Sequence, residues 1–304
     1  MPELPDIELY CGALRERVIR RPLVNVRVLS SFLLRTVDPP LEAANGRTVI
    51  AVSRLGKRIV LGLDGDLHLV IHLMIAGRLR WLASDAKPPG KIALAVFDFP
   101  DGRLVITEAG TKRRAALHLV AGRAALSAHN PGGLEPLTAD LNAFAGALRR
   151  ENHTLKRALT DPRLFSGIGN AYSDEILHAA RLSPVKWTQK LNDDEIAALH
   201  AATIRVLSEW TAALSQEFAG RFPGAGDITA FRPDFAAHGR YGLPCPVCGT
   251  AIQRIRYAEN ETNYCARCQV GGKVLADRSL SRLLKDDWPR SIESLEEHRP
   301  PPNT

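Results

Sequence analysis

Four cysteines near the end of the chain constrain its fold more than any other feature. They form two pairs, Cys245-Pro-Val-Cys248 and Cys265-Ala-Arg-Cys268, in the spacing C-x2-C-x16-C-x2-C. Each C-x2-C turn places two sulfurs on one side of a knuckle, and two knuckles complete a tetrahedron of thiolates around zinc. Two disulfides are the alternative, which a reducing compartment disfavours. We therefore expect one structural zinc ion in a module over residues 240–285, where eight Lys and Arg residues face three acids.

The N-terminus, Met1-Pro2-Glu3-Leu4-Pro5, offers a chemical group as well as a helix start. Removal of Met1 leaves a secondary amine on Pro2, and an α-amino group has a reference pKa of roughly 7.7 to 8.0. Such an amine is partly neutral near neutral pH, and its attack on a sugar aldehyde carbon gives a cationic iminium, an electron sink for elimination. Glu3 lies beside it as a proton donor or acceptor. The simpler interpretation is a helix that opens with proline and an acid. While Met1 remains, the Pro2 nitrogen is an unreactive amide.

The charge balance is basic. The chain of 304 residues has 40 Lys and Arg against 33 Asp and Glu, a net charge of +7, with a pI near 9.3. This balance is compatible with a polyanionic partner such as nucleic acid. No run of about 18 apolar residues and no signal peptide pattern occurs, so we expect a cytoplasmic, nucleoid-associated protein.

The hydrophobic pattern divides the chain into consecutive parts. Residues 5–20 have apolar positions at helical spacing, and Cys11 among them is expected to be a small buried side chain rather than a nucleophile. Residues 23–120 hold eight short β-rich runs, typical of a β-sandwich or barrel, whereas residues 137–217 have helical period and residues 220–233 form a loop rich in Gly and Pro. The fold class is therefore α+β multidomain, with these parts: an N-terminal helix and β-sandwich (1–125), a linker (126–136), a helical domain with a mobile loop (137–239), a zinc ribbon (240–285) and an acidic, proline-rich tail (286–304).

Three separated stretches agree on one family. MPELPDIE at the N-terminus, NHTLKRALTDPRLFSGIGNAYSDEIL at 152–177, and GRYGLPCPVCGT with NYCARCQ near the end together resemble the formamidopyrimidine-DNA glycosylase and endonuclease VIII family of base-excision enzymes. The resemblance implies a β-sandwich headed by a helix, a helix-two-turns-helix domain and a zinc ribbon. It also implies a monomer that binds damaged double-stranded DNA between its two halves, with zinc in a structural role.

By this resemblance, particular residues carry the chemistry. Pro2 is the Schiff-base nucleophile at C1′ of the damaged nucleotide, Glu3 protonates the sugar, and Lys57 contacts phosphate and assists β-elimination. The expected DNA contacts are the phosphate-binding Lys156 and Asn170, together with His72 and the ribbon residues Arg254, Arg256 and Arg267. The wedge Ile75 (or Met74) is expected to fill the gap of the flipped base, beside the basic loop 111–115 with Arg113 and Arg114. Asp174 and Glu175 are expected either to cap the helix that Asn170 opens or to brace the N-terminal amine.

The chain departs from the family pattern in three places. The stretch His72-Leu73-Met74-Ile75-Ala76-Gly77 replaces the usual His-Leu-Gly-Met-Ser-Gly, and the loop 111–115 lacks the usual aromatic residue. In the ribbon, Asn260 replaces an arginine linked to phosphate gripping and to the second, δ, elimination. The neutral amide of Asn260 lacks the positive charge and the paired N–H donors of an arginine guanidinium. We therefore expect δ-elimination to be weak unless Arg254 or Arg256 substitutes.

These departures leave two functions open. The first is a DNA glycosylase that hydrolyses the N-glycosyl bond and acts as an abasic-site lyase. The second is a protein that binds damaged or unusual DNA with little excision. The sequence does not determine which base is excised.

Overall fold

The computed structural model comprises two compact units. One contains Met1–Gly133 with Ser208–Thr229, and the other contains Leu134–Leu207 with Ala230–Thr304. The structure describes all residues except 111, 258–259, 278–280, 282, 284–287 and 298–304, and only the backbone of Tyr257, Asn260, Glu296 and Glu297. None of the described helices has the length and apolar character needed to cross a membrane.

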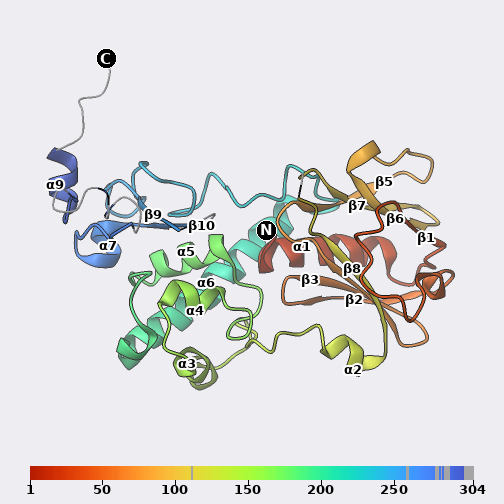
Figure 1. Ribbon diagram of the computed structural model, residues 1–304, viewed down its shortest axis with the longest axis horizontal. Coiled ribbons are helices and arrows are strands. Elements are labelled where there is room, and N and C mark those ends of the chain that lie inside the picture. The colour runs from red at the N-terminus through yellow and green to blue at the C-terminus, as the bar shows by residue number, and fades with distance from the viewer. Residues whose placement is uncertain (111, 258–259, 278–280, 282, 284–287, 298–304) are drawn as a thin grey trace, which may run out of the picture. The chain divides into compact units, whose positions relative to one another are not determined.

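The first unit is a helix followed by eight strands (Figure 1). All eight β-rich runs of the sequence form strands, so this prediction is confirmed. The elements are α1 (Leu4–Val18), β1 (Asn25–Val28), η1 (Leu41–Ala44), β2 (Val49–Leu55), β3 (Arg58–Leu63), β4 (Leu67–His72), β5 (Gly77–Leu82), η2 (Gly90–Ile92), β6 (Ala93–Phe99), β7 (Gly102–Glu108), β8 (Ala116–Ala121) and α2 (Gly122–Ser127).

The eight strands form two antiparallel sheets around one core. Their orders are β1-β6-β7-β5 and β2-β3-β4-β8. Alternating side chains of both sheets enter the same apolar cluster, among them Ile59 and Ile71 from one sheet and Phe97 and Ile106 from the other. A sheet that buries every second residue against a partner sheet is the pattern of a β-sandwich.

Helix α1 begins where its sequence predicts. Glu3 is the N-cap, and its carboxylate and that of Asp6 accept reciprocal backbone hydrogen bonds as a capping box. The helix lies along β2 and β3 (Figure 1), and its apolar face enters the core through Ile7, Leu14 and the fully buried Cys11. Burial raises the pKa of the Cys11 thiol to about 12, as expected for a small apolar side chain rather than a nucleophile.

The second unit is helical in its first part. Asp140 caps the first helix through a hydrogen bond that its carboxylate accepts from the Ala143 amide at 2.8 Å. The helices are α3 (Leu141–Arg149), α4 (Leu155–Thr160), α5 (Asn170–Ala179), η3 (Thr188–Lys190) and α6 (Asp193–Glu217), whose residues after 207 belong to the first unit.

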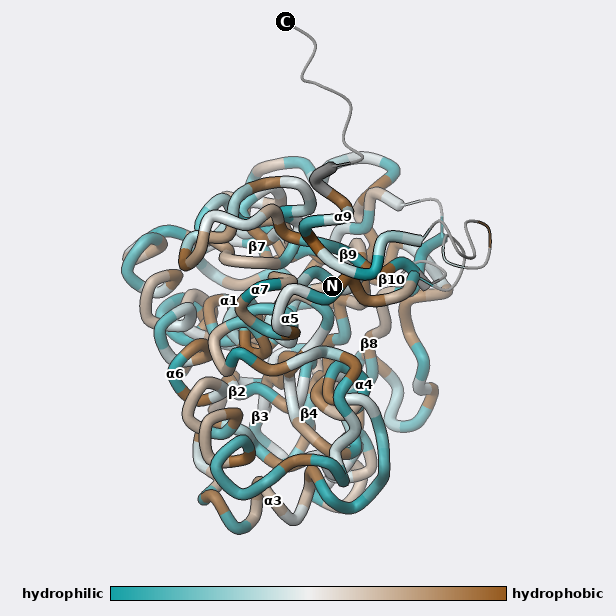
Figure 2. The backbone as a smooth tube through the Cα atoms, turned by 90° about the vertical axis from the view of Figure 1, so that its left-hand side faces the viewer, coloured by the Kyte–Doolittle hydropathy of each residue, from teal (hydrophilic) through white to brown (hydrophobic). Residues whose placement is uncertain are grey.

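A small ribbon completes the second unit. β9 (Gln253–Tyr257) and β10 (Asn260–Tyr264) run side by side as an antiparallel hairpin (Figures 1 and 2), followed by α7 (Ala266–Val270) and α9 (Ile292–Glu297). Ile292 is buried against Tyr264 and Ala266. This part of the expected acidic tail is therefore a docked helix, while 286–287 and 298–304 lie outside the described residues.

The compact units also differ from the consecutive parts expected along the chain. Helix α2 spans Gly122–Ser127, across the expected boundary between the N-terminal part (1–125) and the linker (126–136), and residues 208–229 join the N-terminal unit. In the loop 220–233, Ile228 is buried in the core of that unit and Phe222 packs against it. Apolar residues in a loop rich in Gly and Pro thus anchor part of it to the sandwich.

Candidate functional site

The N-terminal residues are held in a fixed place. Pro2 is buried, and Glu3 is 3% exposed with its carboxylate on the first turn of α1. Met1 is present, so the free amine belongs to it. Burial lowers the pKa of this amine, the carboxylates of Glu3 and Asp6 act in the opposite direction, and the cations of Arg78 and Lys57 lower it further. An amine in this place is favoured in its neutral, nucleophilic form.

Lys57 lies in the turn between β2 and β3. Gly56, which precedes it, has φ +62°, a left-handed conformation that glycine adopts without strain. The effect of the Lys57 charge on the N-terminal amine places this turn near the start of the chain. Three predicted catalytic residues, Pro2, Glu3 and Lys57, are therefore brought together in one unit.

Ile75 lies in the loop that joins β4 to β5. Its side chain is 52% exposed, and Met74 beside it has φ +54°. The Arg78 guanidinium donates to the carbonyl oxygens of Ile75 and Gly77, at 3.1 and 2.7 Å, and so closes the loop. Any Cβ at Gly77 would lie 2.2 Å from the Leu73 carbonyl oxygen, so only glycine fits there. The geometry presents an exposed apolar tip on a tight turn, and His72 ends the strand before it.

The basic loop after β7 is held by one buried acid. The Glu108 carboxylate accepts backbone hydrogen bonds from Arg114, at 3.0 Å, and from Ala115, at 3.1 Å. The side chains of Arg113 and Arg114 are exposed, and Arg113 donates to the Lys91 carbonyl oxygen at 2.5 Å. Thr111, the first residue of the expected loop, lies outside the described residues.

Asn170 opens helix α5 after the turn Gly167-Ile168-Gly169, as predicted. Gly167 has φ +79°. The Asn170 side-chain amide donates to the Glu261 carbonyl oxygen at 2.9 Å, which uses one of its two hydrogens. The ammonium of Lys156 donates to the Asn170 carbonyl oxygen, at 2.6 Å, and to Asp174, at 2.5 Å. Both predicted phosphate ligands thus make internal bonds and keep one further hydrogen to donate.

Asp174 and Glu175 do not cap α5. The Asp174 carboxylate is fully buried and also accepts from His238 Nδ1, at 2.7 Å, and from the Asn263 amide, at 3.1 Å. Glu175 accepts three backbone hydrogen bonds from residues 236–238. Burial raises the pKa of Glu175, while these three bonds lower it. The two acids therefore connect α5 to the segments before and within the ribbon.

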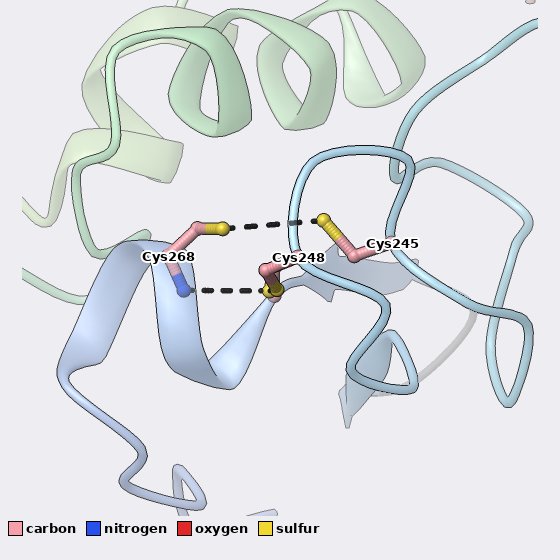
Figure 3. Close-up of side chains that lie close together, drawn as sticks. Cys245, Cys248 and Cys268 are labelled. Carbon is pink, nitrogen blue, oxygen red and sulfur yellow. Dashed lines mark hydrogen bonds between the residues drawn. The ribbon is translucent and has the colours of Figure 1, made fainter.

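The four cysteines of the ribbon meet at one point. Their sulfurs all lie within 4.8 Å of one another, and the sulfurs of Cys245 and Cys268 point toward each other, 4.0 Å apart (Figure 3). His178 of α5 is buried, with Nε2 3.2 Å from the Cys245 sulfur. A tetrahedral thiolate site has this size, and a ring N–H on a ligand sulfur is a common support for one.

The ribbon arginines face an acid of their own hairpin. Arg256 Nε and Arg254 Nη1 lie 3.1 and 3.4 Å from the Glu261 carboxylate. Arg267 pairs with Glu293 at 3.9 Å. The backbone of Asn260 pairs with that of Tyr257, and its side chain is outside the described part of the structure.

Comparison with known proteins decides the family. Three family models match in order: the formamidopyrimidine-DNA glycosylase N-terminal domain at residues 1–115, the formamidopyrimidine-DNA glycosylase H2TH domain at 133–217, and the zinc finger found in FPG and IleRS at 242–270. The formamidopyrimidine-DNA glycosylase of Chloroflexus aggregans is 34% identical over 274 residues, which cover 89% of this chain and 99% of the relative. The chain belongs to the formamidopyrimidine-DNA glycosylase family.

Solved structures of the family agree with this assignment. The Lactococcus lactis Fpg (MutM) in a complex with N7-benzyl-Fapy-dG containing DNA matches with a TM-score of 0.78 and 26% identity, over 88% of this chain and 100% of that one. The Lactococcus lactis Fpg with abasic-site DNA matches with a TM-score of 0.77 and 25% identity, over 88% and 99%. The predicted fold of a formamidopyrimidine-DNA glycosylase is confirmed.

In this family member the four cysteines form the site of one structural zinc ion. Their sulfurs fit a thiolate tetrahedron, and the family's zinc-finger model covers all four. Four protein ligands leave no open position on the metal, so zinc supports the ribbon and takes no part in bond breaking.

Several residues with clear structural roles were missing from the sequence analysis. His178, His238 and Asn263 contact Cys245 or Asp174 across 64 to 89 positions of sequence. No motif in the chain identifies them, because the partners become neighbours only when the helices and the ribbon fold together.

Proposed function

We propose that this chain is a bifunctional DNA glycosylase and abasic-site lyase of base-excision repair. The observation that carries the proposal is a partly buried N-terminal amine whose pKa is affected by the charges of Glu3, Arg78 and Lys57. Family membership supports the substrate class, because relatives of this fold bind damaged or abasic-site DNA. We place the protein in the cytoplasm, associated with the nucleoid.

The proposed reaction begins when Met1 is removed. The secondary amine of Pro2 attacks C1′ of the damaged nucleotide, the bond from C1′ to the base breaks, and the base leaves with the proton that the amine loses. Glu3 donates a proton to the sugar ring oxygen, so the bond from C1′ to this oxygen breaks and the ring opens. The product is an iminium between C1′ and the Pro2 nitrogen. Loss of a proton from C2′ then expels the 3′ phosphate, and water hydrolyses the resulting iminium to an aldehyde and restores the amine.

Other side chains position the DNA in this proposal. The Lys57 ammonium neutralises the departing phosphate. Ile75, at the exposed tip of the loop between β4 and β5, fills the space that the flipped base leaves. Extrusion of a base costs a few kcal/mol, which the inserted side chain offsets. Arg113 and Arg114 lie beside the opposite strand. His72, Lys156, Asn170, Arg254 and Arg256 contact backbone phosphates.

The competing function is damage-specific DNA binding with little excision. Asn260 in place of arginine and the loop without an aromatic residue favour it. The discriminating experiment incubates the protein with duplexes that contain an abasic site or one of a panel of oxidised bases, and measures both binding and strand cleavage. Cleavage on the 3′ side of the site supports the lyase; tight binding with intact strands supports the alternative and contradicts our proposal.

A further inference from the structure

A group of basic side chains lies on the outer face of the sheet β2-β3-β4-β8, next to the Lys57 turn. The register places Arg58 opposite His72 and Val70 opposite His118. Neighbours of these residues in sequence, Ile59 and Leu117, point into the core. Because side chains alternate along a strand, Arg58, His72 and His118 share the face away from the core.

Helix α2 covers part of this face, and the chain after it brings a further histidine to the face. Ala125 and Leu126 pack against Val60, Val70 and Val120 of the sheet. The chain then returns so that the ring centroid of His129 lies 4.5 Å from that of His118. The two imidazoles are therefore held together by packing at the edge of a small apolar cluster.

The charged groups that face this pair are all basic. Burial, together with the charges of His129, Arg58 and Arg35, lowers the pKa of His118 to about 4. Burial and Arg58 also lower the pKa of His129. Burial, followed by Arg58, Lys57 and His118, lowers the pKa of His72 to about 4. Within the described part of the chain, no carboxylate pairs with Arg58, His72, His118 or His129. An acid, Asp66, lies at the other end of this face, beside His68.

A cluster of positive and protonatable groups without a carboxylate complements an anion. Arg58 offers a fixed charge and a fork of donors, and each imidazole offers a ring N–H. Their half-buried positions leave them accessible while reducing competition from water. Lys57 and His72, which the proposed function assigns to phosphate contacts, lie directly beside this group.

We propose that Arg58, His118 and His129 bind one backbone phosphate of the DNA, extending the phosphate-binding surface from Lys57 along the outer face of the sheet toward α2. This inference rests on the proposed function, since it concerns the same DNA. An anion favours the protonated form of the neighbouring imidazoles. Affinity for DNA therefore increases as the pH falls, and binding takes up protons.

The test measures affinity of the full-length protein for a duplex with a tetrahydrofuran abasic analogue, which lacks the C1′ oxygen and forms no Schiff base. Titrations at several salt concentrations are made at pH 6 and pH 8 with three variants: H118A/H129A, H118Q/H129Q and H68A. H68A removes a histidine from the far end of the same face and serves as the matched control. Thermal unfolding checks that each variant folds; glutamine keeps the size and a neutral donor if the alanine pair does not fold.

We expect H118A/H129A to bind about tenfold more weakly than H68A at pH 6, the effect of one lost bond to a charged group. Its salt slope should be smaller by about 0.9, the value for one neutralised phosphate. H118Q/H129Q should lose the pH dependence and keep most of the affinity measured at pH 8. Variants that bind like H68A at both pH values, while wild type binds and cleaves abasic DNA, overturn this inference and leave the proposed function intact. A wild-type protein that does not bind overturns both.

Discussion

Glu3 has a structural role and a proposed catalytic role at the same carboxylate. As N-cap of α1 it accepts a backbone hydrogen bond, and as an acid it donates a proton to the sugar. The variant Glu3→Gln separates the two, because an amide oxygen still accepts the bond but has no proton to transfer. We expect base excision to slow by about 10²- to 10⁴-fold, with thermal stability nearly unchanged.

The comparison variant is Glu3→Ala, which also removes the cap. It should lose about 1 kcal/mol of stability in addition to excision. Single-turnover release of an oxidised base and thermal unfolding of the same samples measure the two effects. Full excision by Glu3→Gln would assign the acid to another residue.

The lowered pKa of His72 predicts that the free energy of unfolding depends on pH. Burial and the neighbouring cations lower its pKa in the folded protein to about 4, against about 6.5 for a free imidazole. The unfolded chain therefore binds more protons between these values, so the stabilisation is present above pH 6.5 and is lost as the pH falls toward 4. The full effect is about 3 kcal/mol. Calorimetry without DNA should show a flatter decline in H72Q than in wild type over this range; parallel declines contradict the assignment.

Some residue roles depend on neighbours in the sequence, and others depend on neighbours in the folded chain. The residues proposed as nucleophile and acid follow one another at positions 2 and 3, and the cysteine pairs follow a fixed spacing, so both sets could be named from the sequence alone. Asp174 was expected either to cap a helix or to brace the N-terminal amine, and the structure shows it as a buried acceptor for Lys156, His238 and the backbone of Asn263. Such a position depends on three segments that meet only in the folded chain.

At the scale of elements, the ribbon depends on its metal and on α5. His178 contacts the Cys245 sulfur, and loss of such a supporting group typically weakens metal binding 10- to 100-fold. We therefore expect His178→Ala to release zinc to a chromophoric chelator at lower chelator concentration than wild type. His200→Ala, whose ring contacts a backbone carbonyl of the same unit, is the control. Equal zinc retention in both variants would remove His178 from the support of the site.

The ion pairs of the β9–β10 hairpin lead to a prediction about the balance between β-elimination and δ-elimination. Arg254 and Arg256 each form an ion pair with Glu261. Because this carboxylate offsets their charge, neither one fully replaces the arginine that is missing at Asn260. Wild type should leave mainly the β-elimination product on abasic DNA, and Asn260→Arg should raise the share of the δ product. Gel analysis of the 3′ ends measures both. A wild-type protein that completes δ-elimination shows that another cation supplies this function.

At the scale of the whole molecule, periodicity predicted the elements better than their partners. Eight β-rich runs gave eight strands, since alternation of apolar side chains is a local property. Residues 208–229 joined the N-terminal unit and Ile292 docked on the ribbon, although composition suggested separate helical and tail segments. Burial of a few apolar side chains determined both placements. These side chains can be recognised only when the surface against which they pack is known.

The proposed reaction requires that the amine of Pro2 forms a covalent iminium with deoxyribose. Borohydride reduction of the protein during reaction with abasic-site duplex, followed by peptide mass spectrometry, tests it most directly. We expect a stable adduct on a peptide that begins with Pro2, and no adduct with Pro2→Gly under the same conditions. An adduct on a lysine, or full cleavage by protein that retains Met1, would contradict it.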